Sequence, residues 1–321
     1  IDRAKLPKGE KFLLHFQAVD FEATVFVNGK EVGKHVGGNT PFFFDVTRFF
    51  GDQESQDIVL RVWDPTDTGS QPRGKQVLQP GGIFYTAVSG IWQTVWLEAV
   101  PETYIRTLRV ESDLDQSKVV VKVETDPPGQ LVGVRVEVLE GKRLRTAAGS
   151  FKGESVSIPL ESPKPWSPET PFLYDLKVSL IRDGKTVDAV TSYFGLRKIS
   201  FGPDEHGKLR LMLNNKPYFQ IGPLDQGWWP DGLLTPPSDE AMAYDLKVLK
   251  ELGFNMLRKH IKVEPARLYY HCDRLGLLVW QDMPSGMREG AKQQVQPGQK
   301  TEAPFNPEES KQFRSELKEM I

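Results

Sequence analysis

The sequence predicts a multidomain protein of the β plus α/β class, with two β-sandwiches followed by the first part of a barrel of alternating strands and helices. Short segments of alternating apolar and polar residues, separated by turn residues, run from position 11 to about position 200. Beyond that point the apolar residues recur every three or four positions, which is the period of a helix. The length of 321 residues suits two or three domains.

The first predicted domain covers residues 1–102. Its apolar segments have the length and alternation of strands, and Asn28-Gly29 supplies the two positive-φ residues that a tight hairpin turn needs. Strands at this spacing predict a β-sandwich. The five segments lie at 12–16, 23–27, 42–46, 58–63 and 94–98.

The second predicted domain covers residues 103–199 and shows no helical period. About 95 residues with about seven short strands are typical of an immunoglobulin-like sandwich, although the cysteine pair of antibody domains is absent. A proline-rich linker at 161–171 is expected to bend the chain before the last strand. The clearest strand segments lie at 108–110, 119–123, 132–138, 155–158 and 173–180.

The third predicted domain covers residues 200–321, where strands and helices alternate. A strand at 218–222 precedes a helix that Ser238 caps and Gly253 ends, and a second strand follows at 254–258. Pro265 suits the first turn of a second helix, which is expected to end at Gly276, before a third strand.

Helix signals in this domain are specific. The first helix has apolar residues at three-to-four spacing on one face, namely Met242, Leu246, Leu249 and Leu252. The third strand is expected at 277–280. The last helix is expected to have Asn306 as its cap, Pro307 as its first residue, Glu309 as the capping-box partner, and Phe313 and Leu317 on its inward face.

Repeated βα units with one apolar strand each imply a parallel sheet, which is either doubly wound or barrel-shaped. No glycine-rich phosphate loop follows these strands, so a barrel is favoured over a nucleotide-binding sheet. An eight-fold barrel takes about 250 residues, whereas this region has room for about three of its units.

Composition excludes several function classes. The chain has 41 Lys and Arg against 43 Asp and Glu, and this net charge of −2 argues against nucleic acid or an anionic membrane as a partner. The single cysteine, Cys272, excludes an internal disulfide and a multi-cysteine zinc site, and the histidines lack metal-ligand spacing. We therefore expect no metal and no cofactor. No apolar run approaches the roughly 20 residues that span a bilayer, and the composition assigns no compartment.

Segments in all three predicted domains recur together in one known family. In the first domain they are VFVNGKEVG at 25–33, PF at 41–42, DVT at 45–47 and SGIWQTVWLE at 89–98. In the others they are WSPETPFLY at 166–174, FGLR at 194–197, LNNKP at 213–217, LGFNMLRKH at 252–260 and CDRLGLLVW at 272–280. In this order and spacing the chain resembles glycoside hydrolase family 2, the family of β-galactosidases, β-glucuronidases and β-mannosidases.

The resemblance implies a jelly-roll, sugar-binding-like first domain, an immunoglobulin-like second domain and a catalytic TIM barrel that hydrolyses β-glycosides with retention. Such enzymes need two carboxyl groups about 5–5.5 Å apart. In the family these are glutamates after the fourth and seventh barrel strands, the first within an Asn-Glu pair. This chain contains no Asn-Glu and is expected to stop before strand four, so no catalytic residue is assigned and the chain alone is expected to be inactive.

Three segments depart from the family pattern. The usual Arg-x-x-His-Tyr-Pro after the second strand is one residue tighter here, as Arg258-Lys259-His260. The usual Asp-Glu after the third strand is Gln281-Asp282, and LDQGWW at 224–229 replaces the usual Asn-Arg-His after the first strand. These differences bear on sugar specificity rather than on the fold.

Substrate-binding candidates lie at the carboxyl ends of the three barrel strands, where barrel active sites form. By resemblance, Arg258 would lie near the nucleophile and keep it ionised; the alternative is a salt bridge that ties a strand to a helix. His260 would bond a sugar hydroxyl or would merely cap the strand end. Asp282 would accept a substrate hydroxyl or would pair with Arg258.

The segment after the first strand carries four more candidates: Asp225, Gln226, Trp228 and Trp229. An indole ring beside hydrogen-bonding side chains suits a pyranose ring. The alternative is that the two tryptophans close the barrel against the first sandwich. In the family a first-domain loop can reach the barrel mouth, and residues 81–85 are the candidate for it here.

Two functions stay open. The first is part of a retaining β-glycosidase whose catalytic acid/base and nucleophile lie outside these residues. The second is a non-catalytic carbohydrate-binding or interaction protein that uses the sandwiches. A β-glycoside is the expected partner in the first case, and oligomerisation is left open. A partial barrel would expose apolar strand edges, so self-association is expected.

Overall fold

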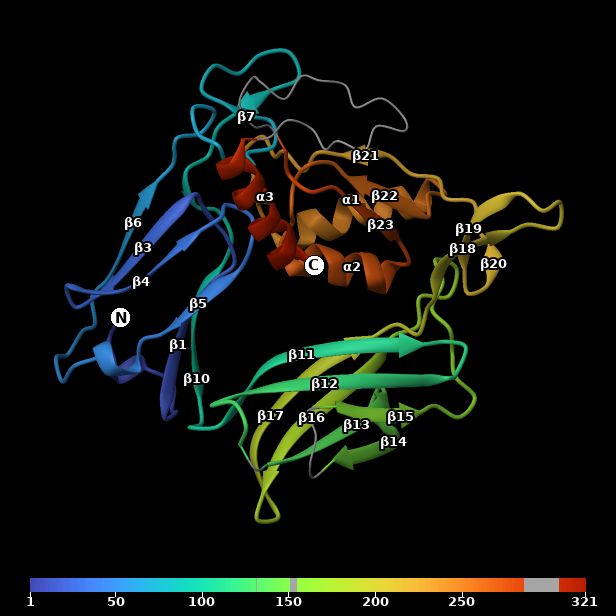
Figure 1. Cartoon of the computed structure of the whole chain (residues 1–321), viewed down its shortest axis with the longest axis horizontal. Coiled ribbons are helices and arrows are strands. Elements are labelled where there is room, and N and C mark those ends of the chain that lie inside the picture. Colours follow the sequence, from blue (N-terminus) through green and yellow to red (C-terminus); the bar gives the residue numbers. More distant parts are fainter. Residues whose placement is uncertain (131, 151–154, 286–305) are drawn as a thin grey trace.

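The computed structural model describes residues 1–130, 132–150, 155–285 and 306–321. In the described chain strands greatly outnumber helices, and its three α-helices lie in the last third. Figure 1 shows two β-rich parts, from the first and second hundred residues, on two sides of the helix-containing part. The boundaries 1–102, 103–199 and 200–321 stay a prediction.

The first β-rich part has two three-stranded sheets that enclose a core of valine, leucine and phenylalanine. All five strand segments predicted here are confirmed, and Asn28 and Gly29 turn the hairpin with φ of 51° and 77°. The first sheet has the order β10 (Val95–Val100), β1 (Lys11–Phe16), β5 (Phe42–Asp45), and the second has β4 (Lys30–Val36), β3 (Glu22–Val27), β6 (Ile58–Trp63). Two-stranded pairs join β2 (Val19–Asp20) to β9 (Gly90–Ile91) and β7 (Gln76–Val77) to β8 (Tyr85–Thr86).

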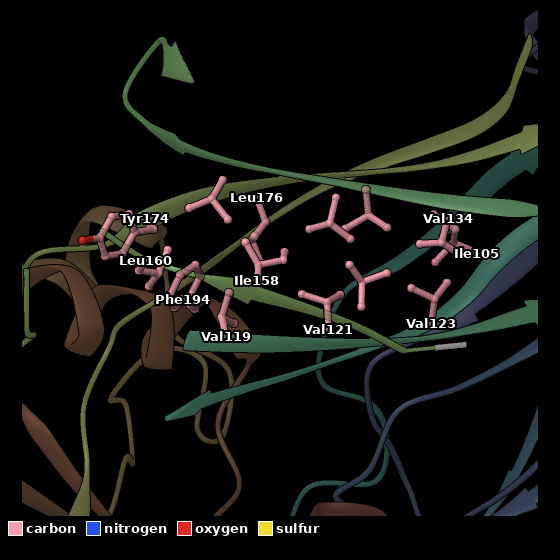
Figure 2. Close-up of a cluster of buried hydrophobic side chains, with 14 of the residues drawn as sticks. Ile105, Val119, Val121, Val123, Val134, Ile158, Leu160, Tyr174, Leu176 and Phe194 are labelled. Atoms are coloured by element: carbon pink, nitrogen blue, oxygen red, sulfur yellow. The ribbon is translucent and has the colours of Figure 1, made fainter. Parts of the chain in front are cut away.

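The described residues of the second β-rich part form seven strands in two antiparallel sheets. Figure 2 shows its core, where valines 119, 121 and 123 lie across from Leu176 and Tyr174. One sheet has the order β11 (Tyr104–Asp113), β12 (Lys118–Asp126), β15 (Ser155–Pro159). The other has β14 (Arg143–Ser150), β13 (Gly133–Glu140), β16 (Tyr174–Arg182), β17 (Lys185–Phe194).

An antiparallel sheet of β18 (Ile199–Pro203), β19 (Leu209–Leu213) and β20 (Lys216–Pro217) leads to a parallel sheet. The parallel sheet has the order β21 (Leu224–Asp225), β22 (Met256–Lys259), β23 (Leu278–Gln281), and it confirms the strands expected at 254–258 and 277–280 within two residues. The strand expected at 218–222 is wrong, because the first parallel strand is β21.

The helices are α1 (Asp239–Glu251), α2 (Ala266–Leu275) and α3 (Pro307–Met320). Ser238 caps α1 through a hydrogen bond from the Ala241 amide, and Gly276 ends α2 in the left-handed conformation, as expected. Pro265 lies one position before the first turn of α2, at its N-cap. The capping box of α3 is present. Among the described helices none combines the length and apolar character that a membrane crossing requires.

Helices α1 and α2 cover one face of the parallel sheet. Met242 and Leu246 of α1 pack with Leu257 of β22 and with Leu268 and Cys272 of α2. This apolar layer buries Cys272, and burial raises the pKa of its thiol to about 12. The cysteine is therefore a packing residue, and the apolar layer holds the parallel strands in place against α1 and α2.

Candidate functional site

The carboxyl ends of the three parallel strands bring Asp225, His260 and Asp282 to one edge of the sheet. The amide of His260 donates to the carbonyl of Asp225 at 2.8 Å, and the amide of Asp282 donates to the carbonyl of Lys259 at 3.0 Å. These bonds continue the strand register one residue past each strand end. They fix the backbone from which the candidate side chains project.

Asp282 is the centre of a charged cluster at this edge. Nε and Nη2 of Arg258 donate to its two carboxylate oxygens at 3.0 and 2.9 Å, and Nδ1 of His260 lies 2.8 Å from Oδ2. Burial alone would raise the pKa of Asp282, but the hydrogen bonds from Arg258 and His260 outweigh it and the pKa is lowered. Asp282 is thus held as a carboxylate.

This cluster has a clear chemical character. A carboxyl group with a lowered pKa holds no proton at neutral pH, so Asp282 is unsuited to protonate a leaving group. The Arg258 side chain is 47% exposed, which leaves its outer edge open to an anion or a hydroxyl group. Arg258, His260 and Asp282 therefore form a binding cluster rather than an acid and base pair.

A cavity of about 940 Å³ lies beside Arg258 on the open side of the sheet. Its wall includes Trp280 of β23, Met256 of β22 and Leu224 of β21, together with Phe219. Two arginines, Arg210 and Arg258, also line it. Apolar walls with a few polar or charged groups are the usual composition of a ligand cavity. The indole of Trp280 is 47% exposed there, and its Nε1 donates to Gln220.

Asp225 points away from this cluster, toward the helix side of the sheet. Its Oδ2 accepts from Nζ of Lys259 at 2.7 Å, and the same ammonium donates to Glu264 at 2.7 Å. Lys262 also reaches Glu264, at 3.0 Å. Lys259 and Glu264 are almost fully buried, so this network joins the ends of β21 and β22 on the helix side of the sheet.

Gln226, Trp228 and Trp229 lie on the same side as Asp225, beside a cavity of about 560 Å³. The ring of Trp228 stacks on Tyr85 from the first β-rich part, with centroids 4.5 Å apart. Trp229 packs against the apolar layer of α1 and α2. The structure thus brings these three residues together with Asp225 and separates them from Arg258, His260 and Asp282.

The first β-rich part reaches this edge through the segment that contains the expected loop at 81–85. Tyr85 makes the stack on Trp228, and the amides of Arg73 and Gly74 both donate to the carbonyl of Ser285 at 3.0 and 2.7 Å. Nε2 of Gln93 donates to the carbonyl of Val263. Residues 73–93 therefore border the carboxyl ends of the parallel strands.

Sequence reasoning missed Lys259, Lys262 and Glu264. For Lys259 the sequence did contain a signal: successive residues of a strand face opposite sides, so Lys259 had to lie on the face of β22 opposite Arg258. The ion pair of Lys259 with Glu264 had no local signal, since Glu264 lies in the loop before α2. Among the described residues no three His, Cys, Asp or Glu side chains gather in a way that would hold a metal ion.

Solved structures with this arrangement place the protein, by fold, in the class of glycoside hydrolases. A β-glucuronidase of Bacteroides uniformis superposes with a TM-score of 0.71 at 25% identity, over 87% of this chain and 35% of that chain. A β-glucuronidase of Ruminococcus gnavus superposes with a TM-score of 0.79 over 97% of this chain and 52% of that one. At 20% identity the second likeness concerns the fold alone.

The chain belongs to glycosyl hydrolases family 2. The family's sugar binding domain matches residues 1–101, and the domain described by the family name matches residues 103–197. A β-galactosidase of Thermoanaerobacter pseudethanolicus is 29% identical over 303 residues, which is 88% of this chain and 38% of the relative. A putative β-glucuronidase of Formosa agariphila is 26% identical over 88% of this chain and 34% of the relative. The chain thus spans little more than a third of these relatives.

Proposed function

We propose that these residues are part of a retaining β-glycosidase that hydrolyses O-glycosyl bonds in carbohydrates. In this proposal residues 1–102 form a jelly-roll, sugar-binding-like domain and residues 103–199 an immunoglobulin-like sandwich. Residues 200–321 form the first three βα units of a TIM barrel. The catalytic acid/base and the nucleophile are supplied from outside these residues.

The observation that carries the proposal is the cluster of Arg258, His260 and Asp282 in a chain of this family. It lies at the carboxyl ends of parallel strands, where barrel enzymes bind substrate. The relatives named above are β-galactosidases and β-glucuronidases, so the substrate class is a β-glycoside. No metal or other cofactor is part of the proposal.

The proposed substrate-binding residues have two different tasks. Arg258 binds an oxygen of the substrate or orients the nucleophile. Asp282 holds its guanidinium, and His260 and Asp282 offer one donor and one acceptor to sugar hydroxyls. Four residues on the other face of the sheet, at the end of β21 and in the loop after it, are proposed to contact a part of the substrate different from the part that Arg258 contacts. They are Asp225, Gln226, Trp228 and Trp229.

The proposal is tested by titrating the 321-residue chain with methyl β-glucuronide and methyl β-galactoside while recording ligand-detected NMR. We expect weak binding that Arg258→Met abolishes. Arg267→Met is the matched control, because Arg267 is 56% exposed against 47% for Arg258 and forms a similar two-pronged pair with Asp239. Binding that Arg258→Met leaves intact contradicts the proposed site.

The alternative is a non-catalytic carbohydrate-binding or interaction protein. One observation favours it, since the family domain that matches residues 1–101 is described as sugar binding. Under this alternative the first β-rich part alone takes the sugar. Binding would then be unaffected by Arg258→Met, so the same titration separates the two functions.

A further inference from the structure

Helix α3 contacts the first β-rich part through a polar face. Gln312, Glu316 and Glu319 are four and three positions apart and therefore share one side of the helix. Figure 1 shows α3 beside β4 and β5. The contacts are Gln312 Nε2 to the Val36 carbonyl at 3.4 Å, Asn39 Nδ2 to Glu316 Oε2 at 3.3 Å, and Thr40 Oγ1 to Glu319 Oε2 at 2.6 Å.

This face differs from the inward face expected from the sequence. Phe313 and Leu317 are half-buried, whereas Glu309 and Glu316 are the buried residues of α3. Glu309 is accounted for by the capping box. Glu316 is 1% exposed, and among the described residues it is covered by the contact with residues 36–40 and bonded by Gln312 of the same helix.

A second buried carboxyl group lies on the other side of the same loop. Asp20 is 5% exposed and accepts from Nε2 of Gln76 at 2.8 Å. A Cβ atom on Gly38 would lie 2.6 Å from Oδ1 of Asp20, and one on Gly37 would lie 3.3 Å from Cγ of Glu316. The two carboxyl groups are thus packed against one pair of glycines, which leaves no room for a larger side chain between them.

The charged groups around Glu316 are mostly acidic. Glu319 is its neighbour on α3, and Asp64 lies behind Asp20 in the first β-rich part. His35 faces Glu319, and burial lowers the pKa of His35, so this imidazole is neutral at pH 7. In the part of the chain that the structure describes, neither Asp20 nor Glu316 takes part in a salt bridge. Two ionised carboxylates buried without a cation are strongly unfavourable.

We propose that α3 docks on residues 36–40 with uptake of a proton by Glu316, so that this contact is a pH-sensitive link between the first β-rich part and the parallel-sheet part. The protonated carboxyl group keeps one acceptor for Asn39 and adds a donor. Loss of the proton leaves a buried carboxylate among Glu319, Asp20 and Asp64, and the helix then detaches more readily.

The direction of the effect follows from the two protonation states. Burial raises the pKa of Glu316 to about 7 from an ordinary 4.5, and Glu319 adds to the rise although Gln312 and Asn39 oppose it. Burial, Asp64 and Glu316 likewise raise the pKa of Asp20 to about 7. The docked state binds more protons, so docking is strongest below pH 4.5 and weakens as pH rises through 7. For Glu316 alone the docking constant falls roughly 50- to 100-fold between pH 5 and pH 8.

The test is amide hydrogen exchange of the 321-residue chain at pH 5 and pH 8, with each rate corrected for intrinsic exchange. We expect the protection of α3 to fall by at least tenfold at pH 8 while the protection of α2 is retained. In Glu316→Gln, which keeps the shape and cannot ionise, we expect a fall of less than about threefold. Glu308→Gln, on the exposed first turn of α3, is the matched control and should behave like the wild type.

Equal protection of α3 at both pH values in the wild type would overturn the proposal. So would an undiminished pH dependence in Glu316→Gln. Protection of α2 reports whether that variant folds. If it does not, the carboxyl resonance of Glu316 in the wild type decides: a titration midpoint near 7 supports the link, and a midpoint near 4.5 refutes it.

Discussion

Arg258 and Lys259 are neighbours in β22, yet their side chains serve opposite faces of the sheet. Arg258 is half-exposed in the cluster with Asp282, whereas Lys259 is buried between Asp225 and Glu264. Burial would lower the pKa of Lys259, but its two carboxylate partners outweigh burial and raise it. Arg258, although paired with Asp282, thus keeps an exposed edge that a ligand can reach, whereas Lys259 holds two strand ends together.

This division predicts a large stability effect at Lys259. Lys259→Met leaves Glu264 buried with only Lys262 as a partner, so we expect a loss of about 3 kcal/mol in the free energy of unfolding. Urea denaturation followed by circular dichroism measures it. Lys247→Met on the exposed side of α1 is the control and should change the free energy of unfolding by less than about 0.5 kcal/mol. A similar small change for both variants would show that the buried network is dispensable.

At the scale of single residues, helix caps and helix ends were easier to predict from the sequence than the partners of charged side chains. Ser238, Gly276 and Asn306 act through adjacent backbone, and each was identified correctly. The pairing of Asp282 with Arg258 was one of two alternatives expected for it, because both residues lie at the ends of neighbouring strands, whereas its contact with His260 was not anticipated. The partners of Lys259 were not anticipated, because the position of Glu264 depends on how the loop before α2 folds.

At the scale of elements, the ends of α1 and α2 offer a direct comparison. Gly253 and Gly276 have similar φ values of 87° and 81°. A Cβ atom on Gly253 would meet nothing within 4 Å, whereas one on Gly276 would collide with the carbonyl of Pro168 in the second β-rich part. Lys250 donates to that same carbonyl at 2.9 Å. The end of α2 is therefore also a contact between two parts of the molecule.

The comparison predicts different costs for two alanine substitutions. Gly253→Ala should destabilise the protein by about 1–2 kcal/mol through backbone strain alone. Gly276→Ala should cost about 1–3 kcal/mol more, because the Pro168 loop must move. Thermal unfolding of the two variants side by side measures the difference. Equal melting temperatures would mean that the Pro168 contact contributes nothing.

Where elements were missed, their position in the sheet explains it. Strands β14 and β17 were not predicted from the sequence. They are the two edge strands of their sheet, and each buries few side chains, so the alternation of apolar and polar residues along them is weak. The wrong strand at 218–222 has another cause. The side chain of Asn255 bonds the Ile221 amide and the Phe219 carbonyl at 2.8 Å each, and so replaces the ladder bonds that a strand would make.

At the scale of the whole molecule, Trp166 ties three segments together. Its ring is fully buried beneath Arg197, and its Nε1 donates to the carbonyl of Asp273 in α2 at 2.7 Å. Arg197 and Tyr193 both reach the carboxylate of Asp273. The order of the parts was predictable from periodicity, whereas these ties join residues up to 107 positions apart and have no sequence signal.

The open side of the parallel sheet predicts self-association. Phe219 and Leu209 are 81% and 73% exposed beside the 940 Å³ cavity, and apolar patches of this kind favour contact with another surface. We expect sedimentation velocity to show a mass that increases with concentration. The double variant Leu209→Ser and Phe219→Ser should suppress the increase, and Leu252→Ser on exposed surface elsewhere should not. A monomer at every concentration would contradict the prediction.

The pairing of β1 with β10 has a consequence for biosynthesis. Lys11 lies opposite Val100, and β1 is the central strand of its sheet, so one of its edges stays open until residues 95–100 are available. At the usual rate of translation, roughly 5–15 seconds separate the synthesis of these two strands. During that interval the nascent chain carries a strand with one unpaired edge. Ribosome-associated chaperones would therefore bind at this stage of translation, and a pause in translation would give the sheet time to close only once Val100 has emerged from the ribosomal exit tunnel.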